Sequence, residues 1–372
     1  MSFGSRLKHA REGAGLTQRA VFEATEIGIS TLSEFENDVR EPSSLQLSKL
    51  AKLLRRRFEY FFEEGEPEQE VVLWREKPET NADDAQRQLI QLAEQFHRLE
   101  TCVGNPELCE LPQVQGSRES FDYIDAQRLA HDFRKSHALG ERPGSTLLRV
   151  LEEVCRVKVF HLPFEPSGTA ACTLDSRYGA AILLNSNNIR WRRNFDLAHE
   201  LFHLFTWNMF RVGPNVDESS EQEEKYANCF ASHLLMPSEP LRLAVAAQRK
   251  GKTALDFDDL FEIARQFDVS VQALVWQMVS VRLIEKAKAQ EMLGKIEGKV
   301  RFWEQRRDAP PPERPLRFEA LAREAMEKGV ISTGKFAEYL GISRRAAMKI
   351  LETEIYAGME LEANAEVEIA DP

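Results

Sequence analysis

Long apolar runs are missing from this sequence of 372 residues. No window approaches the roughly 18 uninterrupted apolar residues that a membrane-spanning helix requires. The first positions also lack the apolar core and small-residue cleavage site of a signal peptide. We therefore expect a cytoplasmic protein that neither crosses a membrane nor enters the secretory pathway.

Cysteine and positive charge are also scarce. The five cysteines are an odd number and none stands in a CxxC pair, which argues against a disulfide framework and against a thiolate zinc knuckle. The 49 Lys and Arg face 60 Asp and Glu, for a formal net charge of −11. This balance excludes a globally basic nucleic-acid binder, so any contact with nucleic acid has to come from one segment of the chain.

Charge, proline content and hydrophobic periodicity divide the chain. The predicted divisions are an N-terminal domain over 1–64, a linker with a helix over 65–120, a main globular domain over 121–307, a small helical module over 316–351 and an acidic tail over 352–372. Within the linker, we expect the apolar segment VVLW to dock on a neighbour. Four prolines in DAPPPERP exclude a helix there, because proline lacks an amide donor and fixes φ.

Helical spacing dominates the main domain, and strand patterns are few. VCRVKVFHLP and the two segments that flank the turn DSRYG have the β-branched or apolar character of strands. The predicted fold class is therefore mostly α with a small sheet, in the α+β class.

The segment NFDLAHELFHLF predicts an amphipathic helix with two histidines on one side. His199 and His203 are four residues apart, so their side chains project from the same face, about 5 to 6 Å apart at Cβ. Two imidazoles placed in this way can bind one zinc ion at roughly 2.0 to 2.1 Å. Glu200 lies beside such an ion, where its carboxylate can take a proton from water. This is the HExxH arrangement of zinc peptidases.

A catalytic zinc needs a third protein ligand and an open position for water. EQEEKYANCFASHLLMP predicts a second helix, on which Glu224 lies one or two turns before the small residues of the buried face. On spacing alone, Glu221 and Glu223 are alternatives. Zinc is the preferred metal, although two imidazoles and a carboxylate also accept manganese or iron.

Together, RRNFDLAHELFHLF and EKYANCFASHLLMP resemble the ImmA/IrrE metallopeptidases, whose patterns are RxFTLAHELGH and ExxANxFAxxLLMP. The resemblance covers roughly residues 121 to 285. It implies a zincin-like, gluzincin-type zinc endopeptidase in which His199, His203 and Glu224 bind zinc and Glu200 is the catalytic base. Asp196 and Phe202 depart from the usual Thr and Gly of the family, which bears on how open the cleft is.

Two further features of this domain bear on regulation and on substrate binding. Cys172 precedes the strand that leads to the metal helix, and its thiolate would act as a cysteine switch if it filled the open position on zinc. The alternative is a small buried apolar residue. The strand before Asn185 would bind an extended substrate by edge pairing. Spacing does not select a residue that stabilises the oxyanion; the candidates are Tyr178, Arg192, Arg193, His161 and Tyr226.

Residues 5–57 fit a helix-turn-helix unit of five short helices. The segments LTQRAVF and LSEFENDVREPS resemble the XRE/Cro family, with its pattern LTQxxLA and ISxIExG followed by PS. The resemblance implies binding of double-stranded operator DNA, with outward side chains of one helix in the major groove. The predicted DNA-binding residues are Gln18, Ser30, Thr31, Ser33, Glu34 and Arg40.

The outward face of this unit lacks Arg and Lys, and Glu34 would repel phosphate, although it could accept a hydrogen bond from cytosine. Affinity then has to come from flanking cations, which a symmetric dimer would double. The cations that we expect to serve are Arg6, Lys8, Arg19 and Arg40. A module that binds protein instead of DNA is the competing interpretation.

The C-terminal segment VISTGKFAEYLGISRRAAMKILE predicts a further pair of helices with a basic second helix. We expect it to be a packing or dimerisation element in preference to a second DNA contact. The whole chain is thus predicted to be a homodimeric transcriptional regulator with a zinc-dependent endopeptidase domain. The resemblance implies cleavage of a helix-turn-helix repressor, or of the chain's own linker, that derepresses stress, prophage or defence genes. The alternatives are a regulator whose metal-binding domain is a non-catalytic sensor of a ligand or nucleic acid, and a toxin-neutralising regulator.

Overall fold

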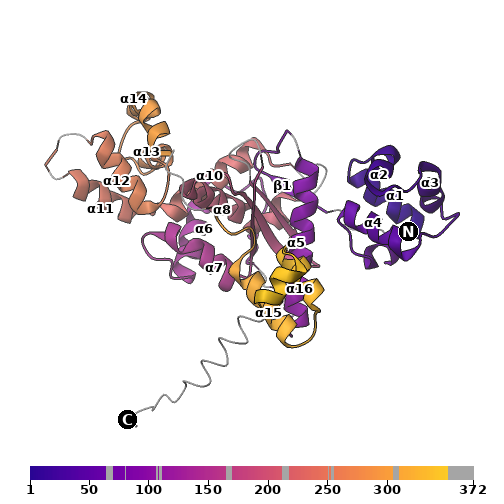
Figure 1. Cartoon of the computed structure of the whole chain (residues 1–372). Coiled ribbons are helices and arrows are strands. Elements are labelled where there is room, and N and C mark those ends of the chain that lie inside the picture. Colours follow the sequence, from indigo (N-terminus) through magenta and orange to yellow (C-terminus); the bar gives the residue numbers. More distant parts are fainter. Residues whose placement is uncertain are drawn as a thin grey trace, which may run out of the picture. The chain divides into compact units, whose positions relative to one another are not determined.

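The computed structural model describes residues 1–63, 70–79, 81–105, 108, 111–164, 170–211, 218–249, 251–252, 255–304 and 310–350 (Figure 1). The chain divides into two compact units. The first comprises Met1–Glu94 and Leu108–Glu313, and the second joins the end of one long helix, from Gln95, to the chain that begins at Arg314. In the described part, no helix has both the length and the apolar character to cross a membrane.

Four α-helices and one 3-10 helix form the N-terminal domain. They are α1 (Phe3–Gly13), α2 (Gln18–Thr25), α3 (Ile29–Glu36), α4 (Ser44–Leu54) and η1 (Glu59–Phe62). The Thr17 side chain caps α2 by accepting a hydrogen bond from the Ala20 amide at 3.1 Å. Leu32 and Phe35 of α3 are fully buried in the core of this domain. The fifth predicted helix is a single 3-10 turn, in which Tyr60 and Phe61 are buried.

The central sheet has four strands in the order β1-β3-β4-β2. They are β1 (Leu73–Trp74), β2 (Lys158–Leu162), β3 (Ala170–Asp175) and β4 (Gly179–Asn185). β2 and β4 are parallel, whereas β3 is antiparallel to both β4 and β1. The three predicted strands of the main domain are therefore present. β1 is the linker segment VVLW, which docks on the edge of β3 as expected.

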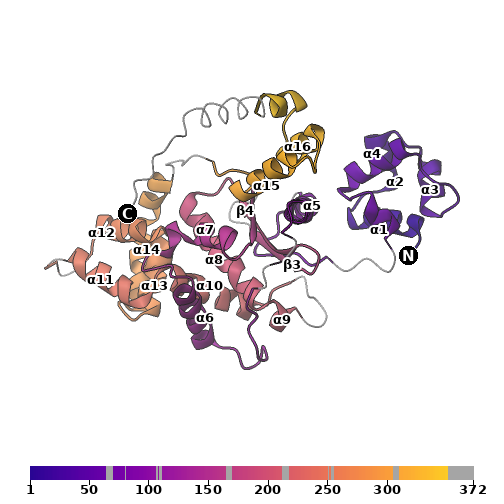
Figure 2. The same cartoon turned by 90° about the horizontal axis from the view of Figure 1, so that it is seen from below.

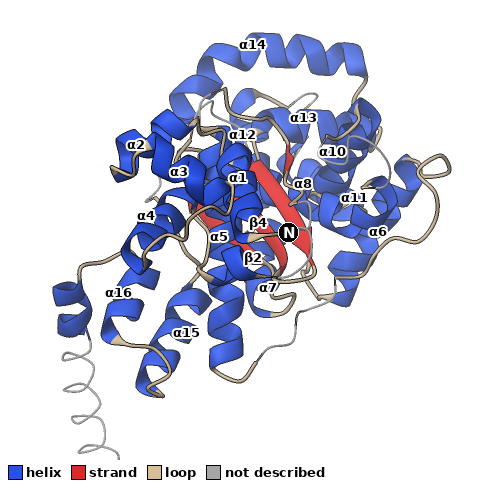
Figure 3. Ribbon diagram, turned by 90° about the vertical axis from the view of Figure 1, so that its right-hand side faces the viewer, coloured by secondary structure: helices blue, strands red, loops and turns tan. Residues whose placement is uncertain are grey.

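Helices surround this sheet. Its strands, which are red in Figure 3, are the only ones in the described part of the chain. The helices that flank its strands in the sequence are α6 (Tyr123–Ser136), α7 (Leu147–Glu153), α8 (Arg190–Phe205), α9 (Trp207–Phe210) and α10 (Glu221–Leu235). α8 packs on β3 and β4, and α10 packs on both α8 and α6 (Figure 2). The later helices are α11 (Ser238–Arg249), α12 (Phe257–Phe267), α13 (Val271–Ser280) and α14 (Lys286–Glu304). The predicted fold class is confirmed.

The second unit is built on the end of α5 (Ala82–Cys102), with α15 (Leu316–Glu327) and α16 (Thr333–Leu340). The Phe96 and Phe318 rings meet edge to face at 5.4 Å, and Arg317 forms an ion pair with the buried Glu100 at 2.6 Å. The C-terminal module is thus packed against a helix that begins in the linker. The predicted acidic tail lies outside the described residues.

Candidate metal centre

Two neighbouring helices supply the residues of the centre. On α8, every residue from Asp196 to Phe205 is buried, because Leu197, Leu201 and Leu204 face the core and the opposite side is covered by α10. On α10, Ala227 and Ala231 have no exposed surface, and their small side chains allow the two helices to approach closely. The predicted helical periodicity therefore places both histidines against α10.

Three side chains converge at this helix pair. The Nε2 atoms of His199 and His203 lie 3.2 Å apart. Glu224 Oε2 lies 3.1 Å from Nε2 of His199, and Glu224 Oε1 lies 3.3 Å from Nε2 of His203. Ligand atoms at 2.0 to 2.1 Å from a tetrahedral zinc ion are about 3.3 Å from one another. The three groups therefore have the spacing of a zinc site, and elsewhere in the described ranges no His, Cys, Asp and Glu cluster does.

The far side of each imidazole is held by α10 as well. Nδ1 of His199 lies 3.2 Å from Asn228 Oδ1, and Nδ1 of His203 lies 2.9 Å from Glu223 Oε1. Glu223 also pairs with Arg211, which follows α9. Such outer contacts fix the orientation and tautomer of metal-binding histidines. From the sequence alone, Glu223 is only an alternative ligand and Asn228 is not predicted to take part, although both lie within four residues of Glu224.

Glu200 is fully buried beside these groups. Neither of its carboxylate oxygens has a hydrogen bond to a nitrogen or oxygen atom in the described part of the chain, and the group beside it is the Cys172 thiol. Burial raises the pKa of Glu200 to about 7. A buried carboxylate without a partner is costly unless another species, such as water or an ion, completes its surroundings. Glu200 therefore has hydrogen-bonding capacity that the nitrogen and oxygen atoms of the described residues do not use.

Cys172 of β3 is also fully buried, and burial raises its pKa well above the ordinary value, with Glu200 adding to the effect. The metal-binding cluster consists of His199, His203 and Glu224 and does not include this sulfur. A cysteine switch requires the thiolate to reach the open position of the metal. The switch therefore stays a prediction, with the buried apolar role closer to the observed surroundings.

Phe202 stands where the family usually has glycine, and it is fully buried. Its ring lies 5.8 Å from those of both Phe121 and Phe230. This substitution therefore fills the space between α8, α10 and the start of α6. Asp196, the other departure, is 1% exposed and pairs with Arg75 of the linker.

The oxyanion candidates have partners in the protein. The Tyr226 hydroxyl donates to the Phe121 carbonyl at 2.7 Å, and Tyr178 contacts the Thr173 hydroxyl at 3.4 Å. Arg193 donates to the Asn188 carbonyl. Arg192 lines a cavity of about 460 Å³ beside the metal helix, together with Arg75, Phe195, Asn228 and Trp276. The contacts of these side chains do not identify which candidate would stabilise the oxyanion.

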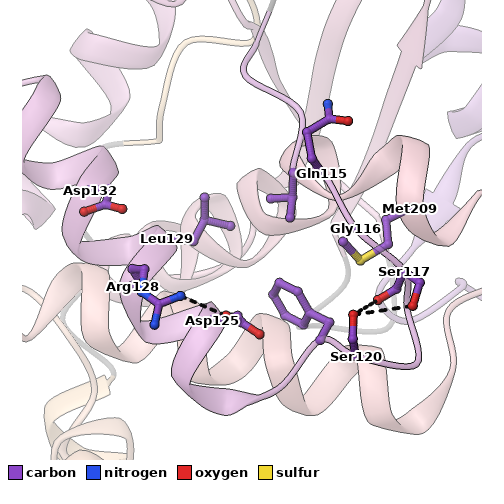
Figure 4. A pocket seen from close by; sticks show the side chains of 11 residues that line it. Gln115, Gly116, Ser117, Ser120, Asp125, Arg128, Leu129, Asp132 and Met209 are labelled. Atoms are coloured by element: carbon purple, nitrogen blue, oxygen red, sulfur yellow. Dashed lines mark hydrogen bonds and ion pairs between the residues drawn. The ribbon is translucent and has the colours of Figure 1, made fainter.

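A second cavity, of about 350 Å³, lies between the start of α6 and the preceding loop (Figure 4). Arg128 pairs with Asp125 at 3.1 Å, and the hydroxyls of Ser117 and Ser120 are 3.4 Å apart. Asp132 adds a second carboxylate to the wall. This cavity has no histidine and no cysteine among its lining residues, so its chemistry differs from that of the metal centre.

The predicted DNA-binding residues lie at the ends and outer face of the helix pair α2 and α3. Ser30 and Arg40 are exposed, whereas Thr31, Ser33 and Glu34 are half-buried. Arg40 is 3.8 Å from Glu34, so the acidic side chain has a cation beside it.

Two polar side chains, those of Gln18 and Arg6, form hydrogen bonds within this domain. Gln18 donates to Glu36 at 2.9 Å, and Glu36 also binds Arg11. The expectation that Arg6 contacts phosphate is wrong: the residue is 2% exposed and donates to the Tyr60 carbonyl at 3.1 Å. Of the other flanking cations, Lys8 and Arg19 are exposed.

Comparison with known protein families finds a match for two segments of the chain. Residues 152–277 match the IrrE N-terminal-like domain of the M78 peptidases, and residues 7–61 match a helix-turn-helix family. The HTH-type transcriptional regulator ImmR of Bacillus subtilis is 47% identical over 53 residues, which are 14% of this chain and 42% of that protein. The aligned segment thus spans less than half of that relative. No solved structure matches the chain.

Proposed function

We propose that this chain, which joins an XRE-type helix-turn-helix domain to an ImmA/IrrE-type M78 domain, is a transcriptional regulator with zinc-dependent endopeptidase activity. One observation carries the enzymatic part. A fully buried Glu200, whose carboxylate has no nitrogen or oxygen partner in the described part and only the Cys172 thiol beside it, lies next to three groups whose ligand atoms have tetrahedral spacing. A purely structural metal site would not require that carboxylate.

The residues present fit zinc, and His199, His203 and Glu224 would hold it. When bound, zinc would polarise a scissile carbonyl and lower the pKa of water. Glu200 would accept the proton of the attacking water and deliver it to the leaving nitrogen. Its raised pKa, about 7, suits a group that both accepts and donates a proton near neutral pH. Asn228 and Glu223 would keep the two imidazoles in place during this transfer.

The test compares the full chain with its Glu200→Gln variant. Zinc content is measured by plasma mass spectrometry, and protein fragments are followed by mass spectrometry in cells after DNA damage. We expect equal zinc in the two proteins and fragments only in cells with the unaltered chain. The absence of fragments under every inducer tried, with zinc bound, would contradict the peptidase proposal.

The helix-turn-helix domain supports the regulatory part of the proposal, and the relative that it resembles is itself called a transcriptional regulator. We propose that a homodimer binds operator DNA and that the substrate is a helix-turn-helix repressor or the chain's own linker. Cleavage would derepress stress, prophage or defence genes. Fusion raises the local concentration of the peptidase at the operator, so cleavage there would not require tight substrate binding.

A second candidate is a regulator whose metal domain senses a ligand or nucleic acid without cutting. The observation that favours it is the burial of the centre, because His199, Glu200 and His203 have 0 to 1% of their surface exposed. Only Glu224 among the four groups is partly accessible, with 24% of its side chain exposed. The fragment analysis above separates the two candidates.

A further inference from the structure

The edge of β3 is occupied by the linker of the same chain. Leu73 is paired with Cys172 and Trp74 with Ala171, in antiparallel register. The Arg75 amide donates to the Ala170 carbonyl at 3.0 Å. At the other end, the Thr173 hydroxyl donates to the Val71 carbonyl at 2.7 Å. Residues 71–75 thus bind β3 in the way that an extended peptide adds to a sheet edge.

The side chains of this segment alternate between the two faces of the sheet. Leu73 shares a face with its partner Cys172, which neighbours Glu200, and it is fully buried in the core of the main domain. Trp74 points the other way, and its ring meets that of Phe164 edge to face at 6.0 Å. Arg75 returns to the face of Leu73, toward the metal helix.

The Arg75 side chain contacts residues in the first half of the metal helix α8 and one residue of α10. Its guanidinium pairs with Oδ1 of Asp196, lies 3.4 Å from Asn228 Oδ1 and covers the Phe195 ring at 5.4 Å. The other oxygen of Asp196 is 3.4 Å from the Asn188 amide and 4.0 Å from Arg192. Because Asp196 is 1% exposed, removing the cation from Oδ1 would leave a buried charge poorly compensated.

We propose that the edge of β3 and Asp196 together form a binding site for an extended peptide with an apolar residue followed, two positions later, by arginine. The chain's own Leu73, Trp74 and Arg75 fill this site and exclude other peptides from it. Asn228 joins the site to the metal centre, because it contacts both Arg75 and His199. This inference deepens the proposed function by naming the substrate pattern and a tethered competitor for it.

The test measures binding in the full chain carrying Glu200→Gln, so that no cleavage intervenes. The probe is a fluorescein-labelled peptide with the sequence of residues 70–78. Arg75→Pro removes both the amide that donates to Ala170 and the guanidinium, and should free the edge. Because a tethered strand competes at a high effective concentration, the peptide should bind this variant at least about tenfold more tightly than its parent. Arg75→Ala, which keeps the amide, should lie between the two.

The arginine preference has its own control. A peptide with alanine in place of its arginine should bind the Arg75→Pro protein about tenfold or more weakly, since a charge-assisted pair is lost. Adding Asp196→Asn should remove this difference between the peptides. Equal binding of both peptides to the Arg75→Pro protein would overturn the inference.

Two measurements keep the outcomes distinct. Circular dichroism identifies an Arg75→Pro protein that has not folded, in which case Arg75→Ala decides the comparison. Absence of peptide binding to a folded variant with a freed edge would overturn the inference. If the peptide binds but the chain with Glu200 restored does not cut it or any other protein, the proposed peptidase activity fails and the binding site stands.

Discussion

Asn228 shows how single side chains hold the metal centre from outside. It is exposed on α10, yet its Oδ1 lies 3.2 Å from the ring nitrogen of His199 that faces away from the cluster. Replacing Asn228 with Ala should weaken zinc binding about 10- to 100-fold, because the imidazole loses the partner that orients it. Competition with a chromophoric zinc chelator measures this change. Gln222→Ala, exposed on the same helix, is the control, and equal zinc affinity of the two variants would contradict the role of Asn228.

His161 of β2 connects a single residue to the pH dependence of folding. Burial is the main cause that lowers its pKa to about 4, and Arg193 adds to it. The unfolded chain, with a histidine pKa of about 6.5, therefore binds the proton first as the pH falls. The free energy of unfolding should drop by up to about 3 kcal/mol as the pH falls from about 6.5 to about 4, and should be unaffected by this group above that range.

Urea denaturation at pH 7.5 and pH 4.5 measures this effect. His161→Gln has no titrating group at this position, so its stability should depend less on pH than that of the unaltered chain. Identical pH dependence in the two proteins would mean that His161 does not contribute.

The residues of the metal centre differ in how far the sequence could predict them. The spacing of His199, Glu200 and His203 lies within one helical turn, so helix geometry alone brings them together. Glu224 required the pattern of a second helix and the family resemblance. Arg75 could not be predicted, because it lies 121 positions from Asp196 and only the pairing of β1 with β3 brings it there.

At the scale of elements, the strand β1 should be possible to lock in place. Directly paired residues of antiparallel strands have Cα atoms about 4.5 to 5.5 Å apart, which is within the range of a disulfide. With Leu73→Cys, diamide should oxidise the new thiol and that of Cys172, its partner in the register, to a disulfide. Peptide mapping by mass spectrometry detects the bond, and binding of the labelled peptide should be lost until a reductant is added.

Leu73→Ala treated with diamide is the control for this experiment, because it keeps Cys172 and removes a similar part of the Leu side chain. Its peptide binding should be the same before and after oxidation. Failure of the Leu73→Cys protein to form the bond, when its fold is intact, would show that the two strands are not paired as described.

Most elements followed from periodicity, and the exceptions have physical reasons. The helix predicted within the linker is α5, Ala82–Cys102, and the three strands β2, β3 and β4 match the predicted segments. The fifth helix of the N-terminal domain is a 3-10 turn of four residues, in which Tyr60 and Phe61 are buried. β1 has two residues, so its extended form depends on the partner strand more than on its own sequence.

At the scale of the whole molecule, DNA binding should depend on salt through few cations. Arg40 is exposed and Arg6 is buried, so only the former can reach a phosphate. Arg40→Ala should weaken binding to the chain's own promoter and reduce the salt dependence of the logarithm of affinity by about 1. Fluorescence anisotropy at several salt concentrations measures both. In contrast, Arg6→Ala should lower the melting temperature, because it removes the hydrogen bond to Tyr60. An unchanged salt dependence in Arg40→Ala would exclude a phosphate contact.

The predicted divisions of the molecule rest on the charge pattern, the metal motifs and the run of prolines, which are features of the sequence itself. The partnership of the C-terminal module with the end of α5 was not predictable, since it depends on contacts such as that of Phe96 with Phe318. Such contacts join residues that are far apart in the sequence, so local sequence patterns do not predict them.

Residues 71–75 lie in the connection between the helix-turn-helix domain and the domain that resembles M78 peptidases, and they contain strand β1 of the sheet. The segment that connects the two domains therefore also occupies the edge of β3. If residues 71–75 left the edge of β3, the connection between the two domains would become five residues longer. If the N-terminal domain binds DNA as proposed, tension on that domain would act on the strand that pairs with β3.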